Sequence, residues 1–245
     1  MRRVRLTVAY DGTNYCGWQL QPTEITIEKV LNDAIRKVTK EEISVIGASR
    51  TDSGVHALGN VAVFDTESAI PPERFCYALN PFLPEDVVVV KSEEVALDWH
   101  PRRNKCTKTY EYKIINAKMP DPTRRHTSHF VSFDLNLERM QKAAAYLVGT
   151  HDFVSFCCVR TSVEDTVRTI YNLDVTKQGD EITIRVTGNG FLYNMVRIIA
   201  GTLIQVGRGY YEPEEVKRML DAKSRIEAGT TAPPQGLKLV EIRYE

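Results

Sequence analysis

The 245-residue sequence predicts an α+β fold built from two similar halves. Segments with an apolar residue at every second position are typical of strands, and segments with apolar residues three and four positions apart are typical of helices. The order strand, helix, strand, strand occurs twice along the chain, which suggests an internal duplication with its boundary near Lys105. We therefore expect one domain over residues 1–104 and a second over residues 105–245.

The first half opens on a clear alternation, in which Val4, Leu6 and Val8 share one face of a strand. Apolar residues at helical spacing follow, and later a run of four valines is typical of a buried strand. In chain order we expect a strand at Val4–Tyr10, a turn at Asp11–Asn14, a helix at 27–38, strands at Ile43–Ile46 and Val61–Phe64, a short helix from Pro71 to about Asn80, and a strand at Val87–Val90.

The second half repeats this order. Asn136 is a suitable N-terminal cap for a helix, and Lys177–Asp180 is typical of a hairpin turn. The expected elements are a strand at Lys108–Ile115, a helix at 137–148, strands at Ile170–Val175 and Ile182–Val186, a helix at Phe191–Val206, a further helix starting at Pro213, and a closing strand at Leu237–Tyr244.

The charge of the chain is balanced overall and uneven locally. Thirty-two basic residues cancel thirty-two acidic ones, so net charge gives no sign of a nucleic-acid partner. The segment 101–108 nevertheless carries four cations and no acid, and Arg124-Arg125-His126 follows it. This clustering favours a basic face that binds RNA, and scattered solvated charge is the alternative.

The cysteines and the first residues point to a cytoplasmic protein. The five cysteines are an odd number without C-x-x-C spacing, which argues against a disulfide framework and against a zinc site. The chain runs from Met1 directly into an alternating strand instead of the apolar core of a signal peptide, and no apolar stretch is long enough to cross a membrane. We expect no membrane association.

The stretch Gly47–Ala57 is the main candidate for a catalytic site. It places Ser49, Arg50, Thr51 and Asp52 between Gly47 and Gly54, with His56 shortly after them, and it lies between two expected strands. Rigid strands can hold such a loop firmly while its backbone approaches a substrate closely. Asp52 is therefore the predicted catalytic carboxylate. His56 either binds a substrate phosphate or holds the loop.

Other chemistries fit this loop poorly. Asp52-Ser53-Gly54 matches the triplet of aspartic peptidases, but the chain has no second D-[ST]-G. Ser49 lacks the final glycine of a nucleophile elbow, because Thr51 stands there. A glycosidase needs a second carboxylate, which the loop does not supply. Neither a P-loop nor G-x-G-x-x-G occurs, so a nucleotide cofactor has no support.

Two further features suggest chemistry. Arg197 stands among apolar residues of the expected helix Phe191–Val206, and a buried guanidinium needs a carboxylate partner, for which Asp52 is a candidate. The alternative is an arginine whose head extends to solvent. Tyr110 and Tyr112 share one face of a strand beside the basic segment, a pattern that suits base stacking but also an ordinary core.

Six motifs, in order, resemble the TruA family of tRNA pseudouridine synthases over nearly the whole chain. They are Tyr10-Asp11-Gly12-x-x-Tyr15-x-Gly17-Trp18-Gln19, Arg50-Thr51-Asp52-x-Gly54-Val55-His56-Ala57, Lys108-Thr109-Tyr110-Glu111-Tyr112, Gly149-x-His151-Asp152-Phe153, Gly188-x-Gly190-Phe191-Leu192-Tyr193-Asn194-Met195-Val196-Arg197 and Thr231-Ala232-Pro233-Pro234-x-Gly236-Leu237. Ser49 and Lys108 depart mildly from the family, where glycine and arginine often stand.

The resemblance implies an isomerase of tRNA processing that converts uridine to pseudouridine at positions 38, 39 and 40 of the anticodon stem-loop. It implies the pseudouridine synthase fold, with two ferredoxin-like halves flanking a basic cleft, and a homodimer without metal or cofactor. By this likeness Asp52 is the catalytic carboxylate and Arg197 its partner, Tyr110 stacks on the flipped uracil, and Arg50 helps to extrude it. His56 is a further candidate for substrate binding.

Two questions stay open at this point. The chain is alternatively a non-catalytic RNA-binding protein or chaperone that uses the same basic cleft. For the enzyme, Asp52 either attacks C1′, adds to C6 of the ring, or removes the C2′ proton.

Overall fold

The computed structural model describes residues 1–158 and 165–245 and confirms the α+β class. The chain divides into two compact units, one of residues Met1–Cys106 with Leu239–Glu245, and one of residues Thr107–Lys238. The last seven residues thus belong to the unit that the first hundred residues build, although the sequence pattern gives no sign of this. None of the described helices is long and apolar enough to span a membrane.

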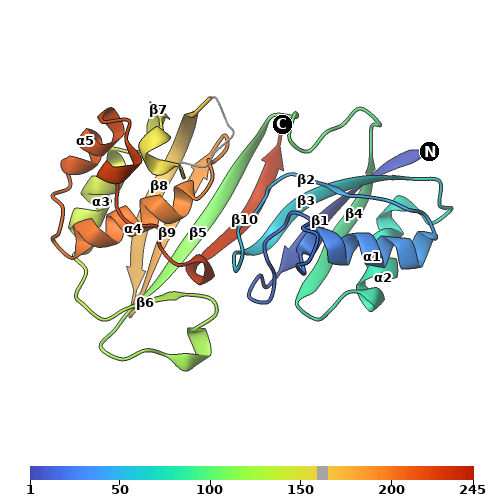
Figure 1. Cartoon of the computed structure of the whole chain (residues 1–245), viewed down its shortest axis with the longest axis horizontal. Coiled ribbons are helices and arrows are strands. Elements are labelled where there is room, and N and C mark those ends of the chain that lie inside the picture. The colour runs from blue at the N-terminus through green and yellow to red at the C-terminus, as the bar shows by residue number, and fades with distance from the viewer. Residues whose placement is uncertain (159–164) are drawn as a thin grey trace. The chain divides into compact units, whose positions relative to one another are not determined.

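The first unit is a sheet covered by helices on one face (Figure 1). The strand order is β4-β1-β3-β10, with short β2 beside β3, and the pairs of β1 with β3 and β4 and of β2 with β3 are antiparallel. The elements are β1 (Arg2–Tyr10), α1 (Ile27–Thr39), β2 (Ile46–Gly47), β3 (His56–Thr66), α2 (Phe75–Leu79), β4 (Val87–Val95) and β10 (Leu237–Tyr244).

Helix α1 matches its prediction because the sequence supplies both its ends and its face. Thr26 caps the first turn by accepting a hydrogen bond from the Lys29 amide, and Lys40 ends the helix in the left-handed region at φ 63°. Ile27, Leu31 and Ile35 are buried against the sheet, as their spacing predicts.

Two expected strands of this unit differ from the structure. Only Ile46 and Gly47 pair with β3, so the strand expected over residues 43–46 is wrong; the Val45 amide instead bonds to the Asn32 side chain at 2.9 Å. The valine run starts β4, but Val88 and Val90 are exposed, because β4 is the edge strand of the unit's sheet and only its other face is covered.

The second unit has the same general plan. Strands follow the order β5-β9-β8-β7, with the antiparallel pairs β5–β9, β9–β8 and β8–β7, and β6 lies parallel to β5. Its elements are β5 (Cys106–Asn116), β6 (His129–Val131), α3 (Leu137–Ala145), β7 (Gly149–Asp152), β8 (Val167–Gln178), β9 (Glu181–Gly188), α4 (Met195–Gly207) and α5 (Glu215–Asp221).

Helix α4 begins four residues later than the apolar pattern predicts. Asn194 adopts φ 62°, a left-handed conformation that a helix cannot continue through, so Tyr193 and Asn194 form a turn ahead of Met195. The turn before α4 places Asn194 beside the predicted site residue Arg197.

Helix α3 begins where expected, because the Asn136 side chain accepts a hydrogen bond from the Arg139 amide.

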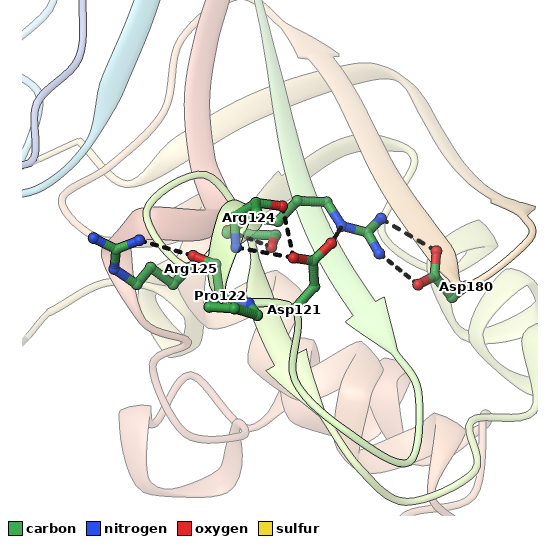
Figure 2. A network of polar contacts seen from close by, with 7 residues as sticks. Asp121, Pro122, Arg124, Arg125 and Asp180 are labelled. Atoms are coloured by element: carbon green, nitrogen blue, oxygen red, sulfur yellow. Dashed lines mark hydrogen bonds and ion pairs between the residues drawn. The ribbon is translucent and has the colours of Figure 1, made fainter.

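The loop between β5 and β6 is tied down by Arg124 (Figure 2). Its guanidinium bonds to Asp121 at 2.8 Å and to both carboxylate oxygens of Asp180 in the β8–β9 turn, at 3.2 and 2.5 Å. Arg125 points away and donates to the Pro122 carbonyl at 2.8 Å. The Arg124 hydrogen bond is the largest cause of a lowered pKa at Asp180, and the Thr123 hydroxyl is the largest cause at Asp121.

We expect the stability of Arg124→Gln to fall less between pH 6 and pH 3 than the stability of the wild type. A carboxyl whose pKa is lowered by folding stabilises the fold above its unfolded pKa of about 3.9, and this stabilisation is lost as the pH falls through the lower folded value. The variant should melt at a lower temperature than the wild type at pH 6, with the difference shrinking towards pH 3. Arg125→Gln is the matched control, and an equally reduced fall in both variants would contradict the assignment.

Candidate active site

The loop that carries Asp52 is fixed to the turn after β1 by backbone hydrogen bonds. The Thr51 carbonyl accepts from the Trp18 amide at 3.0 Å, the Tyr15 carbonyl accepts from the Gly54 amide at 3.3 Å, and Val55 closes a turn by donating to the Asp52 carbonyl at 3.1 Å. Asp52 is half-buried at the tip of this turn. A carboxylate held by backbone contacts on both sides keeps its direction without relying on its own side-chain flexibility.

Two glycines allow the β1 turn and the loop to approach this closely. A Cβ on Gly12 would lie 2.1 Å from the Val55 carbonyl oxygen, and one on Gly17, whose φ is +82°, would lie 2.6 Å from the Thr51 carbonyl oxygen. Any other residue would have to displace backbone. These contacts explain the two glycines of the Tyr-Asp-Gly-x-x-Tyr-x-Gly motif. The sequence alone does not show that the motif packs against the Asp52 loop.

Trp18 packs in the core at the base of the Asp52 loop. It is 1% exposed, its ring lies 6.0 Å from Tyr10, and a Cβ on Gly47 would meet its indole nitrogen at 2.3 Å. A large fully buried ring at the base of the loop removes the space in which the loop would otherwise move. Trp18 therefore supports the loop from the core.

The other candidates of the loop differ in exposure. Arg50 is exposed and His56 is buried. The Gly12 amide donates to His56 Nδ1 at 3.0 Å, and the nearest Asp11 oxygen lies 3.1 Å from the same atom. Because Nδ1 accepts, a neutral ring carries its hydrogen on Nε2. His56 thus holds the β1 turn through one nitrogen.

A turn of the first unit presents several cations. Arg102 and Arg103 are exposed, and the turn is closed by hydrogen bonds from the Arg103 and Asn104 amides to the His100 carbonyl, both at 3.1 Å. The pKa of His100 is lowered by partial burial and by the neighbouring positive charges of Arg103 and Arg102. Concentrated positive charge on a fixed turn suits the phosphates of RNA.

The second unit holds Arg197 in a fixed position at the start of α4. Arg197 is half-buried; its Nε donates to the Ala232 carbonyl at 2.8 Å, and its Nη1 donates to Asn194 Oδ1 at 2.9 Å. The Ala232 amide returns a bond of 3.0 Å to the Arg197 carbonyl. These contacts fix the direction of the guanidinium at the start of α4.

A third close-packed glycine makes this arrangement possible. A Cβ on Gly201 would lie 1.8 Å from the Thr230 carbonyl oxygen, so α4 and the segment that carries Ala232 touch backbone to backbone. Pro233, the residue after Ala232, is held from β5: its carbonyl accepts a hydrogen bond from the Tyr112 hydroxyl at 2.9 Å. Burial raises the pKa of Tyr112, and the charge of Arg197 opposes this. Tyr112 is therefore a core residue that supports Arg197.

Tyr110 occupies the same face of β5 and is 9% exposed. Phe191 packs edge to face against its ring, with centroids 5.2 Å apart and planes at 81°. An edge-on neighbour restricts the plane of the tyrosine ring. Stacking on uracil stays a prediction, as does the pairing of Asp52 with Arg197.

Comparison with known proteins agrees with these features. The family model described as tRNA pseudouridine synthase matches residues 6–102 and 143–245. The tRNA pseudouridine synthase A of Thermoanaerobacter sp. (strain X514) is 51% identical over 244 residues, covering 100% of both chains. Those of Exiguobacterium sp. and Bacillus subtilis are each 47% identical over 245 residues, with at least 99% of each chain covered. The chain belongs to the tRNA pseudouridine synthase family.

Proposed function

We propose that this protein converts uridine to pseudouridine in the anticodon stem-loop of tRNA, at positions 38, 39 and 40, with Asp52 as its catalytic carboxylate. The observation that carries the proposal is the fixed loop of Asp52, which backbone hydrogen bonds hold on both sides. The membership of the chain in the tRNA pseudouridine synthase family gives this carboxylate its reaction. The anticodon positions rest on the resemblance of the motifs to the TruA family. A non-catalytic RNA-binding role is not favoured, because the relatives are named as enzymes.

In this reaction the N1–C1′ bond breaks, the uracil turns, and C5 bonds to C1′. The proton leaves C5 for solvent and N1 gains one, so nothing is consumed and no oxidant is needed. Asp52 attacks C1′, adds to C6, or removes the C2′ proton, and each route requires an ionised carboxylate. We propose that Arg197 pairs with Asp52 and keeps it ionised.

The uridine must first leave the stack, which costs roughly a few kcal/mol. We propose that Arg50 helps to extrude it, that Tyr110 stacks on the flipped base, and that His56 contributes to substrate binding. The exposure of Arg50 and the restricted ring plane of Tyr110 support these roles. The basic turn around Arg102 and Arg103 would contact phosphates of the tRNA.

The proposal extends to the setting of the enzyme. Because its substrate is tRNA, we place the protein in the cytoplasm, and the family resemblance supports a homodimer.

Tritium release from tRNA tests the proposed function. Transcripts labelled at C5 of uracil, each with uridine at one of positions 38, 39 and 40, should release tritium with the wild-type protein in buffer containing EDTA. A transcript with cytidine at all three positions is the matched control. Binding of tRNA without release of tritium would support the non-catalytic RNA-binding alternative. Equal tritium release from the control transcript would refute the assigned positions.

A further inference from the structure

Asn60 on β3 is a fully buried polar side chain with no place in the proposed chemistry. Its exposure is 0%, yet it makes four hydrogen bonds. Oδ1 accepts from the Ser49 amide at 3.3 Å and from the Val61 amide at 2.9 Å. Nδ2 donates to the Ser49 carbonyl at 3.0 Å and to the Tyr10 hydroxyl at 3.2 Å.

These partners fix which way the amide points. Backbone amides only donate and the Ser49 carbonyl only accepts, so oxygen must face the former and nitrogen the latter. The Tyr10 hydroxyl consequently accepts from Asn60. The same hydroxyl also shares a hydrogen bond of 2.7 Å with Thr51 Oγ1, in which either hydroxyl can donate. The hydrogen bonds thus connect Asn60 through Tyr10 to Thr51.

These hydrogen bonds of Asn60, Tyr10 and Thr51, called the relay below, hold the loop on both sides of Arg50. Asn60 holds Ser49 by its amide and carbonyl, and Tyr10 holds the side chain of Thr51, whose carbonyl is already held by Trp18. With residues 49 and 51 fixed, the backbone that leads into Asp52 has little freedom. Hydrogen bonds suit this task because they fix direction as well as distance, which apolar packing alone does not.

We propose that Asn60 and Tyr10 are positioning residues for catalysis, which act through Thr51 on the direction of Asp52. The inference rests on the proposed function, since positioning matters only if Asp52 reacts. A carboxylate must stay within about 0.5 Å of its productive position, and a shift of roughly 1 Å can lower a rate by about 100-fold. The loss of one link should therefore affect turnover more than tRNA binding.

Tyr10→Phe, Thr51→Val and the double variant test the relay. Each single change should lower kcat about tenfold and leave KM for tRNA within about twofold, because the ring packing and the basic surface remain. The double variant should be no slower than the slower single variant, since all three break the same link. Tyr244→Phe is the matched control: it removes the bond from Tyr244 to the Pro101 carbonyl, 2.9 Å long, in the same unit.

Exchange of the Asp52 backbone amide gives a second readout that does not depend on activity. It should be faster in Tyr10→Phe than in the wild type and unchanged in Tyr244→Phe. Normal kcat and normal exchange in Tyr10→Phe, multiplied losses in the double variant, or an equal loss of kcat in Tyr244→Phe would each overturn the relay. An inactive wild-type protein would overturn the proposed function instead, and the inference with it.

Discussion

Asp52→Asn should fold, bind tRNA and form no pseudouridine. The amide is close to the carboxylate in size, so the backbone bonds of Thr51, Gly54 and Val55 that hold the loop remain. It is neither a nucleophile nor a base, however, and all three possible routes begin with one of these. We expect the rate of tritium release to fall by at least roughly 10⁴-fold, the scale seen when an enzyme loses its reacting group.

The control for this experiment is Asp65→Asn in the same unit. Asp65 bonds to Arg3 at 2.7 Å through each of its oxygens, and its lowered pKa is caused chiefly by that arginine. Its loss removes an ion pair from the sheet without touching the loop. Asp65→Asn should therefore release tritium at the wild-type rate, and comparable release by Asp52→Asn would mean that another residue carries the chemistry.

Tyr110→Phe and Tyr110→Ala should behave very differently. Phenylalanine keeps the ring and its edge-on contact with Phe191, so turnover should stay within about threefold of the wild type. Alanine removes the platform, and because stacking on an aromatic ring contributes about 1–3 kcal/mol per base, turnover should fall by about 100-fold. Single-turnover assays on folded protein measure both effects.

Because Tyr110 is buried, the alanine variant also loses core contacts, and a matched control is needed. Tyr171→Ala removes a tyrosine that is 53% exposed on β8 of the same unit. It should leave turnover unchanged. Circular dichroism at the assay temperature should show both alanine variants folded. Equal and near-normal rates for Tyr110→Phe and Tyr110→Ala would refute stacking as the role of Tyr110.

The sequence predicts elements well where their signals are local. The cap at Asn136 and the alternation of β1 depend on neighbouring residues, and the structure confirms both. The strand expected at residues 43–46 fails because pairing with β3, and not β propensity, decides which residues join a sheet. Likewise α4 begins late because a single left-handed residue, Asn194, overrides an apolar pattern that continues through it.

The candidate site divides in the same way. Asp52 stands out because polar residues crowd between two glycines, a local signal. Asn60 does not, since one asparagine in a strand has no distinctive neighbours, and its role depends on bonds to Ser49 and Tyr10 that only the fold creates. The same is true of Gly12, whose need for a hydrogen side chain comes from Val55, far along the chain.

The C-terminal strand has a consequence for the order in which the protein is made. Residues Leu239–Tyr244 of β10 lie beside β3, visible in Figure 1 as the red strand next to the cyan one, and the Glu245 amide bonds to the Lys105 carbonyl at 3.2 Å. A ribosome synthesises the whole second unit before these residues. Until then the sheet behind the Asp52 loop has an open edge, the kind of surface that pairs with other chains. A nascent chain therefore carries Asp52, the proposed catalytic aspartate, for most of translation before its supporting sheet is complete.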